Sequence, residues 1–172
     1  MNEAELPAAW SDMRDVFEVD GSLRDIVVTG THLDDWERAY DFVRKLVADG
    51  KARLETDPHP LPALSQIFAL RAERSVVLSM HLGSVRVNCF FFDEEEIEFD
   101  VDPRDVPAEN EARVVTSFME GLAHATERQV RLTGEGAHDR PWLWFEPSQN
   151  AWTFDSSPAV TAAARDQRFI AD

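Results

Sequence analysis

The sequence predicts an α+β fold in which one face of an antiparallel sheet packs against two principal helices. Residues 75–102 contain three successive strand patterns with alternating apolar and polar side chains. Two longer stretches, near 31–50 and 108–128, instead repeat apolar residues at three- and four-residue steps. Further strand patterns near 25–29 and 142–146 extend the same sheet.

The N-terminal part predicts two short helices around the first strand and the first long helix. Residues 7–17 and 63–73 have short helical patterns, and residues 25–29 are rich in β-branched side chains. The first long helix begins at Thr31 or His32, where Thr31 and Asp34 have the spacing of a capping box. Its apolar stripe consists of Leu33, Trp36, Tyr40, Val43 and Val47.

A hairpin is the clearest local prediction. The patterns at 75–82 and 85–92 are joined by Gly83-Ser84, and a two-residue loop with glycine first is typical of a type II′ turn. Because that turn sets the register, each residue has a predicted partner across the hairpin. On the apolar face the pairs are Leu82 with Val85, Met80 with Val87, Leu78 with Cys89, and Val76 with Phe91. On the other face they are His81 with Arg86, Ser79 with Asn88, and Val77 with Phe90.

The third strand, 97–102, continues this meander. Its apolar residues belong in the core, which places Ile97 by Phe91, Phe99 by Cys89 and Val101 by Val87. On the opposite face, the same register places Glu98 by Phe90, Asp100 by Asn88 and Asp102 by Arg86. A slip of one residue would reverse every one of these assignments.

The C-terminal part predicts the second long helix at 108–128 and then strands near 130–132, 142–146 and 152–154. Ser157-Pro158 has the cap-then-proline pattern that opens a last helix. The resulting order of elements broadly resembles a ferredoxin-like sandwich with an added strand, a likeness of architecture only. We expect a single globular domain over 1–172, with 1–20 and 156–172 as peripheral helical or flexible extensions.

Charge dominates the composition. The 172 residues include 17 Lys and Arg and 33 Asp and Glu, for a formal net charge of −16. Such a chain disfavours direct binding to nucleic acid or to an anionic membrane surface, whereas a basic protein is a favoured partner. Cys89 is the one cysteine in the sequence, and the N-terminus lacks the basic-then-apolar pattern of a signal peptide. We therefore expect a cytoplasmic protein.

The acidic residues concentrate in one segment. Seven of the ten residues from Asp93 to Asp102 are acidic, and from position 96 they alternate with apolar residues. In a strand, one face therefore carries a row of like charges that water, a cation or a basic partner must screen. We predict a partner-binding surface of Phe90, Phe92, Glu96, Glu98, Asp100, Asp102, Arg86 and His81.

The leading hypothesis is a non-catalytic protein that captures a basic partner, such as a bacterial immunity protein that neutralises a toxin. One alternative is an enzyme that uses His81, Arg86 and nearby carboxylates, with Ser79 as a conceivable hydroxyl. Another is a homodimer that buries Phe90 and Phe92. The loop 93–96 is a weak candidate for Ca²⁺ or Mg²⁺, and no histidine has zinc-finger spacing. We expect no metal, no cofactor, and an unreactive buried Cys89.

Overall fold

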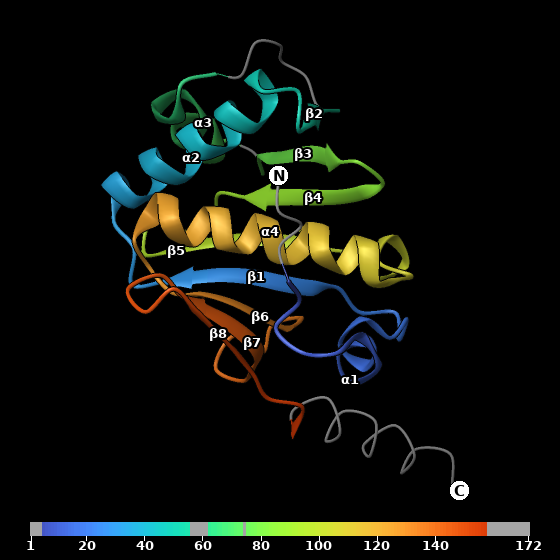
Figure 1. Cartoon of the computed structure of the whole chain (residues 1–172). Coiled ribbons are helices and arrows are strands. Elements are labelled where there is room, and N and C mark those ends of the chain that lie inside the picture. Colours follow the sequence, from blue (N-terminus) through green and yellow to red (C-terminus); the bar gives the residue numbers. More distant parts are fainter. Residues whose placement is uncertain (1–4, 56–61, 74, 158–172) are drawn as a thin grey trace, which may run out of the picture.

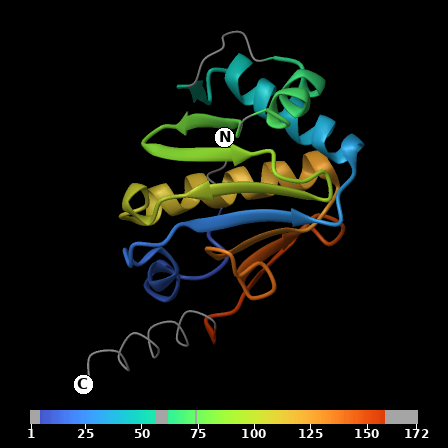
Figure 2. The ribbon, with the colours of Figure 1, turned by 180° about the vertical axis from the view of Figure 1, so that it is seen from behind.

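The computed structural model describes residues 5–55, 62–73 and 75–157. It confirms the α+β class: eight strands form one open antiparallel sheet in the order β2-β3-β4-β5-β1-β6-β7-β8. The helices α2 and α4 cross one face of this sheet (Figure 1), and the view from behind shows the other face in front of them (Figure 2). The predicted C-terminal helix after Ser157 lies outside the described residues.

The strands are β1 (Arg24–Thr29), β2 (Arg53–Leu54), β3 (Val77–Leu82), β4 (Val85–Phe90), β5 (Glu96–Val101), β6 (Val130–Gly134), β7 (Pro141–Glu146) and β8 (Ala151–Phe154). The helices are α1 (Trp10–Met13), η1 (Arg14–Phe17), α2 (Leu33–Ala48), α3 (Leu64–Arg71), η2 (Pro103–Asp105) and α4 (Glu109–Thr126). Because β5 lies between β1 and β4, these two run parallel, as in the split βαβ unit of a ferredoxin-like sandwich.

The predicted registers are confirmed where the strands pair. Across the β3–β4 hairpin Leu82 faces Val85 and Val77 faces Phe90, and Gly83 has the positive φ of 63° that its turn position requires. Along β5, Phe99 lies beside Cys89 and Asp100 beside Asn88. The alternation of apolar and acidic residues therefore places the aliphatic side of the meander against the helices, as expected.

One local prediction is wrong. The α2 N-cap is His32, whose backbone N–H donates to Asp35 at 2.9 Å, so the Thr31–Asp34 capping box does not form. Strand β7 departs from simple alternation, because the β6–β7 pairing shifts register between Leu132 and Thr133. A bulge of this kind turns Trp142 into the core beside Leu143, and both side chains are buried.

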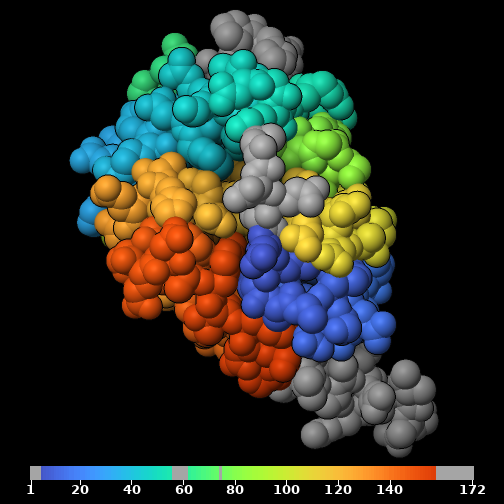
Figure 3. Space-filling model, viewed as in Figure 1, coloured from blue at the N-terminus to red at the C-terminus, as the bar shows by residue number. Residues whose placement is uncertain are grey.

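The N-terminal segment is tied to the sheet by a buried arginine. Arg24, 1% exposed, donates hydrogen bonds to the carbonyls of Val16 and Glu18, and its guanidinium lies 5.1 Å from the centre of the Trp142 ring. The segment adds Met13, Val16 and Phe17 to the core. Figure 3 shows this segment and the two long helices side by side over the helix-bearing side of the sheet.

Asp35 links the two long helices. This carboxylate is 1% exposed and pairs with Arg38 on its own helix and with Arg128 just after α4, whose Nε lies 2.9 Å away. Burial alone would raise the pKa of Asp35, but the Arg128 side chain, the His32 N–H and the two arginine charges outweigh burial and lower the pKa. Ionised Asp35 therefore stabilises the fold.

We predict that Asp35→Asn lowers the free energy of unfolding by about 2 kcal/mol at pH 6, since two arginines and the α2 N-terminus lose their anion. The folded-state pKa is depressed, so this stabilisation is present above the ordinary Asp value of about 3.9 and is lost as the pH falls through the folded pKa. Urea unfolding of the variant and the wild type at pH 6, 4 and 3 measures this stabilisation. A difference between variant and wild type that stays constant over this range would contradict the prediction.

Candidate functional site

A row of polar side chains crosses the outer face of the sheet, the face opposite α2 and α4. The strand registers bring together Ser79, Asn88, Asp100, Asp25 and Thr133, one from each of β3, β4, β5, β1 and β6. Hydrogen bonds of 2.7 Å run from the Ser79 hydroxyl to Asn88 and from the Asn88 amide to Asp100. Within the row, the carboxylates of Asp100 and Asp25 face each other on neighbouring strands.

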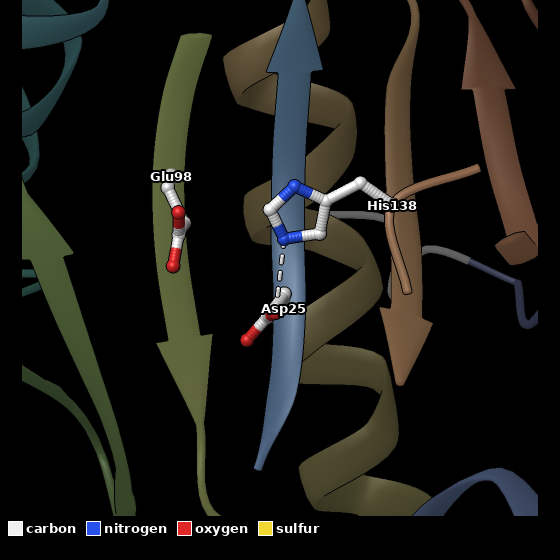
Figure 4. Close-up of side chains that lie close together, drawn as sticks. All are labelled: Asp25, Glu98 and His138. Carbon is white, nitrogen blue, oxygen red and sulfur yellow. Dashed lines mark hydrogen bonds and ion pairs between the residues drawn. The ribbon is translucent and has the colours of Figure 1, made fainter. Parts of the chain in front are cut away.

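The loop between β6 and β7 folds back over this row and covers Asp25. Gly136, whose φ is 67°, donates its N–H to Asp25 Oδ2 at 2.8 Å, and His138 Nε2 lies 3.0 Å from the same oxygen. Asp25 is consequently only 4% exposed. Figure 4 shows the His138 ring in front of β1, with Asp25 and Glu98 on the same side of their strands.

His138 bridges two carboxylates. Its Nδ1 lies 3.0 Å from Glu96 and its Nε2 the same distance from Asp25. Burial alone would lower the pKa of His138, but the hydrogen bond to Asp25 and the charges of Glu96, Asp25 and Glu98 raise it above the ordinary value. These acids therefore favour the protonated ring more than water does, and each ring nitrogen faces a carboxylate.

Glu98 and Asp100, the two central acids of β5, lie where ionisation of a carboxyl group is unfavourable. Burial is the main cause that raises the pKa of Glu98, and the charges of Asp25, Glu96 and Asp100 raise it further. Burial likewise raises the pKa of Asp100, which is 4% exposed, and its hydrogen bond from Asn88 only partly offsets this. Among the residues that the structure describes, no donor hydrogen-bonds to the Glu98 carboxylate.

The predicted partner-binding surface is only partly accessible. Phe92 is 63% exposed and stacks on Phe90 with ring centres 5.1 Å apart, and Val77 lies opposite Phe90 in the sheet. Glu96 and Glu98 are partly exposed. Asp100, in contrast, is buried, so its expected role as an accessible surface charge needs correction: the pleat directs it outward, but the polar row and its neighbours cover it.

The remaining predicted residues lie along the same face but have separate partners. Asp102 binds Arg104 through both carboxylate oxygens, at 2.9 and 3.0 Å from the arginine Nε. Arg86 is exposed, and its backbone N–H donates to Asp105. His81 pairs with Glu55 at 2.7 Å rather than with Ser79, whose hydroxyl is directed at Asn88. The conceivable Ser–His–acid arrangement therefore lacks its central hydrogen bond.

The acidic loop before β5, residues 93–95, accepts hydrogen bonds through its backbone carbonyls from α2 and from the segment just before that helix. Thr31 donates its hydroxyl to the carbonyl of Glu94, and Trp36 donates its indole N–H to that of Asp93. These contacts leave the side chains of Asp93, Glu94 and Glu95 exposed. The loop is thus a solvated acidic edge beside Phe92.

Other candidate features lie elsewhere. Cys89 is buried in the apolar core, where burial raises its thiol pKa and so disfavours the reactive thiolate. A shallow groove between the N-terminal segment and η2 has Arg14, Val19 and Arg104 on its walls, away from the polar row. None of the helices described in the structure has the length and apolar character needed to cross a membrane.

Sequence reasoning missed Asp25 and His138 as site residues. The available signal for Asp25 was an acid at the edge of the apolar run Ile-Val-Val, on the face opposite Ile26. His138 follows a Gly-Glu-Gly turn in a loop, and no pattern ties it to a strand more than 100 residues earlier. Only the pairing of β1 with β6 brings the two together.

Comparison of the chain with protein-family models, with curated proteins and with solved structures gives no match. The functional argument therefore depends on the side chains themselves.

We predict that Asp100→Asn raises the free energy of unfolding by about 1 kcal/mol at pH 7, because it removes a buried charge facing Asp25 and retains an oxygen that accepts from Asn88. The folded-state pKa of Asp100 is raised, so the cost of ionisation is present above that pKa and absent below the unfolded value of about 3.9. Chemical denaturation at pH 7 and pH 4 checks this. A variant less stable than wild type at pH 7 would show that the Asp100 charge is compensated.

Proposed function

We propose that the protein captures a basic protein partner through the exposed end of its outer sheet face. The observation that carries the proposal is the Phe90–Phe92 stack, with Phe92 63% exposed, next to Glu98. Exposed aromatic side chains are typical of interface hot spots, and their rings contribute large contact area at low entropic cost.

The surroundings of this stack favour a cationic partner. Val77 and Glu98 flank Phe90 on neighbouring strands, and the exposed acids of residues 93–95 follow Phe92. We name Val77, Phe90 and Phe92 with Glu94, Glu95 and Glu98 the aromatic–acidic patch. Acids around an apolar centre accelerate encounter with a basic surface, and the net charge of −16 acts in the same direction. Neutralisation of a basic toxin, as an immunity protein performs it, is one task that such a surface suits.

We predict that Phe92→Ser weakens binding to the partner by at least about tenfold, as expected for an aromatic anchor. Glu94→Lys with Glu95→Lys lowers the association rate and flattens its salt dependence, because steering charges are reversed. The partner is first isolated as a complex from the source cells, and binding of the purified pair is then followed by surface plasmon resonance at several salt concentrations.

Matched controls lie on the helix-bearing side. Leu33 is 46% exposed and Asp41 is exposed on α2, so Leu33→Ser removes an exposed apolar side chain and Asp41→Lys reverses an acidic charge away from the patch. Equal losses for the Phe92 and Leu33 variants, or binding that does not respond to salt, would contradict the proposal. If sedimentation of the isolated protein shows a dimer that Phe92→Ser dissociates, the patch is a homodimer interface instead.

A further inference from the structure

We propose that Asp25, Glu98 and His138 form a binding site for a first-row divalent transition-metal ion on the outer face of β1 and β5. The ligand atoms of these three side chains all lie within 4.8 Å of one another. Figure 4 shows them converging from two neighbouring strands and the β6–β7 loop. The site shares Glu98 with the aromatic–acidic patch, but it lies on the Asp25 side of that residue and does not depend on the proposed partner binding.

The geometry is close to that of bound ligands. Two donors on a tetrahedral ion, each about 2.1 Å from the metal, lie about 3.4 Å apart. His138 Nε2 and Asp25 Oδ2 are 3.0 Å apart already, so a small opening of this pair admits an ion between them. Rotation of the Glu98 side chain, which is partly exposed, completes a three-ligand site with its fourth position available to water.

The surroundings of His138 match those of a metal-bound histidine. Metal-ligating histidines usually donate their second ring N–H to a carboxylate, which fixes the tautomer and the ring orientation. His138 Nδ1 is 3.0 Å from Glu96 on one side, and Nε2 faces Asp25 on the other. An ion bound at Nε2 replaces the proton there and leaves the Nδ1–H bond to Glu96 in place.

The surroundings of Glu98 give a further indication. Its carboxylate is partly buried beside Asp25 and receives no hydrogen bond within the described ranges. Buried anions are normally paired or coordinated to a metal. The partners of other acids show the contrast: Asp35 has two arginines and Asp102 has Arg104.

The ligand set indicates the class of ion. Ca²⁺ and Mg²⁺ prefer sites made only of oxygen, whereas imidazole with carboxylates suits Zn²⁺ and its neighbours in the first transition row. A dication is favoured here, because Asp25, Glu96 and Glu98 surround one imidazole. We therefore use Zn²⁺ as the probe.

Isothermal titration of the untagged full chain with Zn²⁺ at pH 7.5 tests the site. We expect one ion per chain, and weakening on the order of 100-fold in Glu98→Gln and in His138→Gln, with a smaller loss in Glu96→Gln. Asp100→Asn is the matched control for Glu98→Gln, since both remove one negative charge from the same face of β5. His81→Gln is the control for His138, since His81 also pairs with a glutamate, Glu55, at 2.7 Å.

A site-specific readout separates coordination from general attraction. Long-range ¹H–¹⁵N spectra of the histidines should show Zn²⁺ at Nε2 of His138, with the proton retained on Nδ1. Glu98→Gln is nearly isosteric and removes a charge that burial opposes, so its thermal midpoint without metal should be no lower than that of wild type, and Zn²⁺ should no longer raise it. This behaviour would separate a lost ligand from a damaged fold.

Three results would overturn the proposal. The first is the absence of Zn²⁺ binding by the wild-type chain. The second is an equal loss of affinity in Glu98→Gln and Asp100→Asn, which would indicate diffuse electrostatic attraction. The third is a Zn²⁺-dependent shift of His81 or His124 in place of His138.

Discussion

The crowding of carboxylates on the outer face of β5 and β1 is the constraint that organises this side of the molecule. Ile26 and Phe99 are completely buried or nearly so on the helix side, so the pleat directs Asp25, Glu98 and Asp100 to the opposite face. The acids cannot turn away without exposing the core. The molecule instead brings His138 over Asp25 and next to Glu98, from a loop that lies 113 residues after Asp25 in the chain.

Two acidic residues show how differently the fold treats its charges. Asp35 is nearly inaccessible, yet two arginines and a helix N-terminus lower its pKa, so its charge stabilises the contact between α2 and α4. Glu98 is more accessible, no hydrogen bond reaches its carboxylate from the residues that the structure describes, and burial raises its pKa. Asp35 forms a structural ion pair, whereas the charge of Glu98 is offset only in part by His138, and perturbed acids of this kind cluster at functional sites.

The outer face therefore has two regions with different chemistry. Its centre is a hydrogen-bonded row in which the β6–β7 loop covers Asp25, and the acids beside His138 suit a cation. Its end, at Phe90 and Phe92, is apolar and exposed among acids and suits a protein surface. Glu98 lies between the two regions, beside Phe90 on one strand and close to Asp25 on the other.

The sequence alone determined the α+β class, the two long helices and the register of the β3–β4–β5 meander. These features depend on short-range rules, since strand alternation, helical periodicity and the Gly83 turn act over a few residues. The tertiary structure alone decided that β1 pairs with both β5 and β6, that a bulge buries Trp142, and that Asp100 is covered. The tertiary structure also formed the Asp25–Glu98–His138 cluster, because the strand order and a long-range loop contact bring these residues together. No local sequence pattern predicts this contact.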